Sequence, residues 1–184
     1  MPRIVRKPIA LTLAALFSAA ALGAQPAQAD DHEVALAVYL TGYSYWDNTP
    51  PGSTAIARPV VNSEAGGEGT YERPITIAVG HAIENGTQTL QFPEGTRFYL
   101  RRFKKYAIVE DVCGDGDRPQ DGPCYVGYRG HPWLDLYIGG SQSSQETAVK
   151  CARHLTGLQM IILNPDRGYE VVPGAMIESG CRAF

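Results

Sequence analysis

The stretch Trp133-Leu134-Asp135-Leu136-Tyr137-Ile138-Gly139-Gly140 places one acidic residue inside an apolar run with the composition of a buried β-strand. Side chains alternate across a strand, so the three aliphatic residues share one face and Trp133, Asp135 and Tyr137 share the other. Burying a carboxylate among apolar side chains is costly unless the group has a partner. Asp135 is therefore the first candidate for function, although a half-buried strand with one polar residue would show the same pattern.

The N-terminus has the pattern of a secretory signal peptide. Three basic residues precede an apolar run over residues 9–22, and Ala27-Gln28-Ala29 offers small residues for cleavage. We expect a signal over residues 1–29 and one mature domain over residues 30–184, secreted to the extracellular space or the periplasm, with no membrane segment after cleavage. A chain of this length suits a single core, and we expect a monomer.

The charge balance argues against nucleic acid as a partner. The whole chain has a formal charge of −3, but the signal holds three of the 16 Lys and Arg residues and none of the 19 Asp and Glu residues. The mature part therefore has 13 basic against 19 acidic residues, which gives −6. The densest basic cluster, Arg101-Arg102 with Lys104-Lys105, lies between apolar runs and is expected to be a solvated hairpin.

All four cysteines follow the signal, and an even number in an oxidising compartment predicts two disulfides. Three pairings are possible; we favour Cys113 with Cys124, which bracket one Gly/Asp/Pro loop, and Cys151 with Cys181. That loop carries several aspartates but lacks the regular spacing and closing Glu of a calcium loop. We therefore predict no metal and no cofactor.

The remaining patterns predict a mainly β protein with one helix. Asn85-Gly86 predicts a tight turn, and the runs 97–100 and 106–113 read as a hairpin. Ser143-x-x-Glu146 predicts a helix that continues through Leu155. Further strands are expected at 34–45, 76–79, 160–163 and 169–172, and closing them into a small barrel would remove exposed edges.

A second candidate region follows the first strand, where Tyr43, Tyr45, Trp46 and Asp47 precede Pro50-Pro51-Gly52. Aromatic rings beside a carboxylate, stopped by a rigid turn, fit a presented binding surface as well as they fit the end of a barrel. Asp111 ends a predicted strand, and we expect it near the same groove as Asp135. The irregular stretch over 53–71 is long for a small domain, and such loops are often functional.

Two of these motifs resemble one superfamily. Ser44-Tyr45-Trp46-Asp47 resembles a signature of family 45 glycoside hydrolases, and Leu134-Asp135-Leu136 with Gly139-Gly140 is similar to a segment that those enzymes share with expansins. Gly95-Thr96-Arg97-Phe98 and the stretch 109–113 resemble the middle strands of the same barrels. The resemblance to expansin-like and barwin-like proteins implies a six-stranded double-psi β-barrel with one short helix and long loops.

Carried over by position, the resemblance makes Asp135 the general acid and Asp47 the general base. An inverting glycosidase needs one protonated and one ionised carboxyl group, about 6.5 to 9.5 Å apart. Asp135 among apolar neighbours suits the first role and Asp47 in a polar turn suits the second. The family's histidine two residues before the acid is replaced here by Trp133, which argues against catalysis. Expansins keep the acid but lack the base. Because this chain retains Asp47, the motifs do not decide between a hydrolase and an expansin-like protein.

The leading interpretation is a secreted, expansin-like protein that binds or loosens cell-wall polysaccharide, either glucan or peptidoglycan. Its groove would combine Asp47 and Asp135 with substrate-binding Tyr43, Tyr45, Trp46, Asp111, Trp133 and Tyr137. The first alternative is a weak inverting endoglucanase or peptidoglycan-lytic enzyme that uses the same carboxylates. The second is a protein-binding module such as a secreted protease inhibitor, with the 53–71 loop as the contact.

Overall fold

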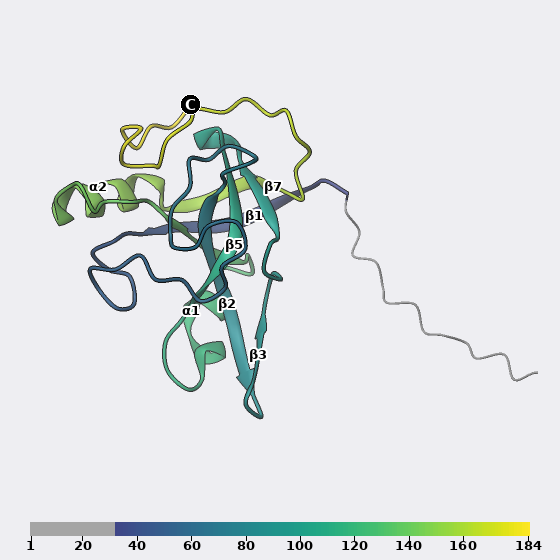
Figure 1. The fold of residues 1–184 in the computed structure, drawn as a ribbon. Helices are drawn as coiled ribbons and strands as arrows, with labels where there is room; N and C mark the ends of the chain where they lie inside the picture. The colour runs from purple at the N-terminus through teal and green to yellow at the C-terminus, as the bar shows by residue number, and fades with distance from the viewer. Residues whose placement is uncertain (1–31) are drawn as a thin grey trace, which may run out of the picture. The chain divides into compact units, whose positions relative to one another are not determined.

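Strand pairing closes the main sheet on itself. The computed structural model describes residues 32–184; the predicted signal peptide, residues 1–29, lies outside the described residues. The strands pair in the order β2-β5-β4-β7-β1-β6, and β6 pairs again with β2, so six strands form a closed barrel (Figure 1). The prediction of a mainly β, six-stranded barrel is confirmed; its double-psi connection stays a prediction. The barrel strands are β1 (Val34–Tyr43), β2 (Ile75–Glu84), β4 (Arg97–Leu100), β5 (Lys105–Cys113), β6 (Trp133–Tyr137) and β7 (Gly157–Leu163).

Apolar side chains from every barrel strand fill the interior. Leu134, Leu136 and Ile138 are fully buried, as their alternation predicts, and β1 and β2 add residues of the same kind. A short strand, β3 (Thr87–Leu90), pairs with β2 and makes a hairpin that runs on beyond the barrel (Figure 1). The turn of this hairpin is Asn85-Gly86, and both residues have positive φ, as a type I′ turn requires.

Helix α2 (Gln145–Leu155) is the main helix of the fold. Its N-cap is Ser144, one residue after the predicted cap, and the Ser144 hydroxyl accepts a bond from the Thr147 amide at 3.2 Å. Gly42 of β1 lies so close to Leu155 that a Cβ would come within 3.0 Å of the leucine. The missing side chain therefore lets the helix approach the barrel.

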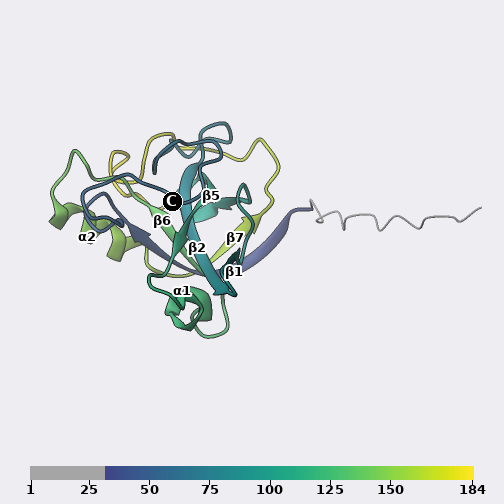
Figure 2. The same cartoon turned by 60° about the horizontal axis from the view of Figure 1, so that its bottom comes forward.

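The short helix α1 (Pro123–Val126) lies well away from α2 (Figures 1 and 2). Two 3₁₀ turns, η1 (Arg101–Phe103) and η2 (Pro119–Asp121), complete the regular elements. Disulfides join Cys113 to Cys124 and Cys151 to Cys181, so the favoured pairing is confirmed. Two disulfides are compatible with an extracellular location. Among residues 32–184, no helix is both long and apolar enough to cross a membrane.

Two predictions are wrong, and both concern the packing of the C-terminal segment on Lys105. Lys105, expected in a solvated hairpin, is only 1% exposed, and its Nζ donates to the carbonyls of Val172 and Gly174, each at 2.6 Å. Burial lowers its pKa. The predicted strand at residues 169–172 is absent. The Val172 amide donates to the Lys104 carbonyl at 3.1 Å, and Lys105 and the stacking of Tyr169 on Tyr99 hold the rest of the segment without a strand ladder.

Candidate functional site

A groove of about 380 Å³ lies at one end of the barrel. One wall is the segment after β1, which Asn48 braces by donating from Nδ2 to the carbonyls of Ser53 and Ala55, both at 3.0 Å. The other wall begins at the end of β5 and continues through residue 115. Four aspartates line the groove together with Tyr43: Asp47, Asp111, Asp115 and Asp135. The structure thus brings together both predicted catalytic residues and two of the six predicted substrate-binding residues.

Strand register explains why two of these carboxyl groups meet here. Asp135 of β6 pairs with Thr41 of β1 on one side and with Ala78 of β2 on the other. Ala78 in turn pairs with Asp111 of β5. Asp111, Ala78, Asp135 and Thr41 therefore form one row across four neighbouring strands. Two strand spacings separate the aspartate backbones by about 10 Å, and the small Ala78 leaves the space between them open.

A β-bulge sets this row. The register of β2 against β5 shifts between Ile77 and Ala78: Ile77 pairs with Val109, whereas Ala78 pairs with Asp111. Glu110 is the extra residue, and bulges next to functional sites commonly redirect a side chain in this way. Without the bulge, Glu110 would oppose Ala78, and Asp111 would point to the other face.

The Asp135 carboxyl has few hydrogen-bond donors around it for a group that is partly buried. It is half-buried, and within residues 32–184 its hydrogen-bond donor is the Thr41 hydroxyl, which donates to Oδ1 at 2.7 Å. Loss of solvation, which is the largest cause, acts together with the negative charges of Asp47 and Asp111 and against the Thr41 bond, and the net effect raises the pKa of Asp135 to about 7. Asp135 can therefore carry a proton near neutral pH.

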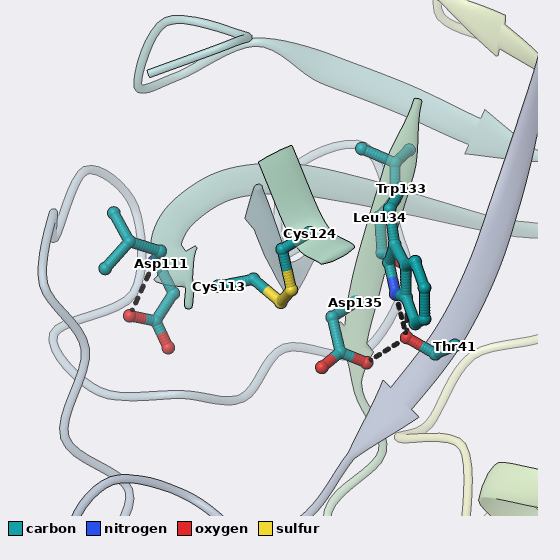
Figure 3. Close-up of a disulfide and its surroundings, with 8 residues drawn as sticks. Thr41, Asp111, Cys113, Cys124, Trp133, Leu134 and Asp135 are labelled. Carbon is teal, nitrogen blue, oxygen red and sulfur yellow. Dashed lines mark hydrogen bonds between the residues drawn. A yellow bond between two sulfur atoms is a disulfide. The ribbon is translucent and has the colours of Figure 1, made fainter. Parts of the chain in front are cut away.

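Asp111 is surrounded differently. It is 7% exposed and accepts three hydrogen bonds: from the Tyr43 hydroxyl at 2.8 Å, the Ala57 amide at 3.1 Å and the Val112 amide at 2.9 Å. Burial raises its pKa, while these three donors lower it. Burial, together with the charge of Asp111 and the hydrogen bond to it, raises the pKa of Tyr43 well above its usual value. Figure 3 shows the Cys113–Cys124 disulfide between Asp111 and Asp135, with both carboxyl groups on the same side of it.

Asp47 is the exposed member of the set. Its Oδ1 accepts bonds from the Ser44 amide at 2.7 Å and the Ser44 hydroxyl at 2.5 Å, which close a tight turn after β1. Among residues 32–184, no group donates a hydrogen bond to Oδ2, so one oxygen is available to a ligand or to water. Asp47 also borders a second depression, which has Trp46 and helix α2 in its lining.

The other four predicted substrate-binding residues do not line the groove, because the fold uses each of them elsewhere. Tyr137 is 4% exposed and packs edge-on against Tyr43. Trp133 donates from Nε1 to the Thr41 hydroxyl at 2.7 Å and packs against Tyr39. Trp46 donates to the Gly140 carbonyl at 2.9 Å and contacts Tyr45 edge-on. The groove is thus acidic with one tyrosine, and the aromatic lining that we expected is not there.

Three important residues were not predicted. Thr41 had a readable signal, since it alternates with Tyr39 and Tyr43 on the strand face opposite Leu40. Glu110 is the second such residue. It and Asp111 are adjacent acids inside the apolar run Ile108-Val109-Glu110-Asp111-Val112, and this break in the alternation could have indicated a bulge. Ala78 had no signal, because its role depends on which strands flank it.

Glu110, fully buried, anchors the long loop over residues 53–71. Its Oε1 accepts from the amides of Val60, Val61 and Asn62 at 3.2, 2.6 and 2.7 Å. Its Oε2 accepts from Asn62 Nδ2 at 2.7 Å and from the Thr76 hydroxyl at 3.0 Å. These bonds fix the loop to the barrel beside the groove.

Within residues 32–184, no group of three or more His, Cys, Asp or Glu side chains could hold a metal ion. The chemistry that the groove can perform with its own residues is proton transfer between carboxyl groups in unlike environments. The class that fold and site define is a mainly β protein with a closed six-stranded barrel and a groove lined by carboxyl groups.

Comparison with known proteins assigns the family. A family model described as the DDB_G0273701 N-terminal domain matches residues 35–182, and the chain belongs to this family. It is 36% identical over 124 residues to the Dictyostelium discoideum protein named uncharacterized protein DDB_G0273701/DDB_G0273221; the match covers 67% of this chain and 48% of that protein. The chain thus spans about half the length of this relative. No solved structure matches. The names do not mention expansins, barwin or glycoside hydrolases, so that resemblance rests on the motifs.

Proposed function

We propose that this protein binds a cell-wall polysaccharide in the groove and cleaves one of its glycosidic bonds. One observation carries the proposal: Asp135, with a pKa raised to about 7, lines the same groove as the solvent-exposed Asp47. The pair provides one protonated carboxyl and one accessible acceptor, as inverting hydrolysis requires. The sequence motifs around both residues support the same assignment.

In this reaction Asp135 donates its proton to the glycosidic oxygen as the bond to the anomeric carbon breaks. A water molecule attacks that carbon from the opposite side, and Asp47 accepts the proton that the water loses. Asp111 does not exchange protons in this scheme. Its three donors fix it as a nearby acceptor, and it helps to keep Asp135 protonated. Secretion by the predicted signal would bring the protein to its polymer.

The test is release of reducing ends by the mature protein from insoluble glucans, chitin and peptidoglycan. Asp135→Asn keeps the shape and the acceptor for Thr41 but cannot supply the proton, so we expect activity to fall by about 10²- to 10⁴-fold. Glu84→Asn, an exposed change at the far end of β2, is the matched control and should be neutral. No release from any polymer by the wild type would refute cleavage.

Binding or loosening without cleavage is the second candidate, and one contact favours it. Oδ1 of Asp47 already accepts two hydrogen bonds from Ser44, which give this carboxylate a structural role in closing the turn after β1. Retention of the protein on a polymer that it does not cleave, lost when Asp47 and Asp135 are both replaced by Ala, would establish this function instead.

The protein-binding alternative is favoured by the loop over residues 53–71. Glu110 holds this loop against the barrel through the amides of Val60, Val61 and Asn62, and yet the side chains of Val60 and Val61 are 52% and 43% exposed. A fixed loop with exposed apolar residues suits a protein partner. If so, Val60→Asp with Val61→Asp would abolish capture of that partner, whereas Asp135→Asn would leave it intact.

A further inference from the structure

We propose that Trp133 is a positioning residue that determines which oxygen of Asp135 carries the acid proton. The inference rests on the proposed role of Asp135 as the acid. Trp133 itself does not line the groove. It stands two residues before Asp135, where the resemblance to the glycoside hydrolases leads one to expect a histidine, and it acts through Thr41.

The directions of two hydrogen bonds follow from the chemistry of the donors. The indole N–H of Trp133 lies 2.7 Å from Oγ1 of Thr41 and can only donate, so the threonine oxygen accepts this bond. The Thr41 hydroxyl has one proton of its own. Oδ1 of Asp135 lies 2.7 Å away, whereas the next acceptor, the Leu134 carbonyl, lies at 3.5 Å. The hydroxyl proton therefore belongs to the bond with Asp135 (Figure 3).

This arrangement makes Oδ1 an acceptor. A proton on Oδ1 would face the hydroxyl proton of Thr41, and the hydroxyl could turn away only toward the more distant Leu134 carbonyl. The acid proton is therefore placed on Oδ2. A carboxyl group without such a neighbour could hold its proton on either oxygen, and only one of them would be aimed at the bond to be cleaved.

Rigid packing keeps the indole in place. The Trp133 ring packs edge-on against Tyr39, with ring centroids 4.7 Å apart, and Tyr39 stacks on Tyr128 at 4.3 Å. The strand register places Tyr39 opposite Trp133 and Thr41 opposite Asp135. Two register pairs, two residues apart along the same parallel strands, thus supply the contacts from Tyr39 through Trp133 and Thr41 to Asp135.

The test is a double-mutant cycle with Trp133→Phe and Thr41→Val. Trp133→Phe removes the indole N–H and keeps an aromatic ring, and Thr41→Val removes the hydroxyl and keeps the shape of the side chain. Without the indole bond, both lone pairs of Thr41 Oγ1 are available to a protonated Oδ1, which favours the acid form, so the pKa of Asp135 should rise. We expect kcat to fall about tenfold with KM unchanged, because misplacing a catalytic group slows only the reaction. Thr41→Val should show at least the same effect, and Trp133→Phe should add nothing in the Thr41→Val background. Thr41→Ser should restore both values.

Carbon-13 NMR titration of the Asp135 carboxyl measures the same coupling without any substrate. It therefore separates failure of this inference from failure of the proposed function. An Asp135 pKa that Trp133→Phe leaves unchanged, or effects of the two changes that simply add, would overturn the role of Trp133.

If Trp133→Phe does not fold, the wild type still gives an answer. The indole N–H resonance of Trp133 should shift with the midpoint of Asp135 as pH rises. The Trp46 indole donates to a backbone carbonyl and is the internal control. A Trp133 resonance that ignores the Asp135 titration would refute the inference.

Discussion

Glu110 and Asp135 are both carboxyl groups on strands of one barrel, yet the fold treats them in opposite ways. Glu110 is fully buried and accepts five hydrogen bonds. Asp135 faces the groove and accepts a hydrogen bond from the Thr41 hydroxyl. The bulge in β5 turns Glu110 toward the long loop and leaves Asp111 in the row with Asp135.

The difference separates a structural acid from a chemical one. A buried carboxylate with a full set of donors stabilises the fold and has no free lone pair for a ligand. A carboxyl with one donor near two other negative charges retains a proton and can release it. The number of donors around each group, and not burial alone, indicates which acid takes part in chemistry.

The largest effect on stability is expected from Glu110→Gln. The new amide group would place a donor against at least one existing donor, and the ionic hydrogen bonds would be lost. We expect a loss of about 3 kcal/mol in the free energy of unfolding, measured by urea denaturation with the disulfides intact. Hydrogen exchange at the Val61 and Asn62 amides should speed up. The control is Glu84→Gln at an exposed position, and a Glu110→Gln variant as stable as this control would remove the contrast with Asp135.

Asp135→Asn should change stability in the other direction. The folded pKa of about 7 lies above the unfolded value of 3.8, so the folded state binds more protons between these limits. Wild-type stability therefore falls as pH rises from about 4 to about 7 and is constant above. The full shift corresponds to about 4 kcal/mol, and partial exposure of Asp135 to water reduces this cost. Asn carries no such cost, so the variant should gain roughly 2 kcal/mol at pH 8 and nothing at pH 3. A loss of stability at pH 8 would show that Asp135 is a structural acid like Glu110.

Tyr43→Phe tests the intermediate case, Asp111, and should have a smaller effect. It removes one of three donors and leaves the buried Oδ2 unpaired. We expect a loss of about 1 kcal/mol in urea denaturation at pH 7. Because the Tyr43 bond lowers the pKa of Asp111, that pKa should rise in the variant. An unchanged Asp111 titration would mean that its two backbone donors alone determine its state.

The smallest change to the molecule is a change of pH. Catalysis by protonated Asp135 should decline as pH rises through about 7, since the acid form disappears. Rates of reducing-end release between pH 5 and pH 9 check this. Activity that keeps rising above pH 8 would assign the proton donor to another group.

The sequence predicted the elements better than it predicted the lining of the site. The alternation around Asp135, the Asn85-Gly86 turn and the cysteine loop are local signals, and the structure contains all three features. Strand alternation also placed Trp133 and Asp135 on one face, correctly. It could not show that the indole would be directed to Thr41 and not to the groove, because that depends on the register of β1 against β6.

Asp111 and Ala78 show the same limit. Their place in the row depends on a bulge and on β2 lying between β5 and β6, and both are properties of the closed barrel. Motif resemblance brought Asp47 and Asp135 together before the structure did, whereas strand alternation and local composition led us to expect the aromatic residues in the groove as well. In the structure, packing and hydrogen bonds hold Trp133, Trp46 and Tyr137 outside the groove lining.

The most direct test of the central claim is the titration of Asp135 itself in the wild-type protein. Carbon-13 NMR of labelled aspartate carboxyls, with Asp135→Asn to assign the signal, should give a midpoint near pH 7. A midpoint near 4, the ordinary value for an exposed aspartate, would contradict the account, because Asp135 would then be ionised at neutral pH and could not act as the proton donor.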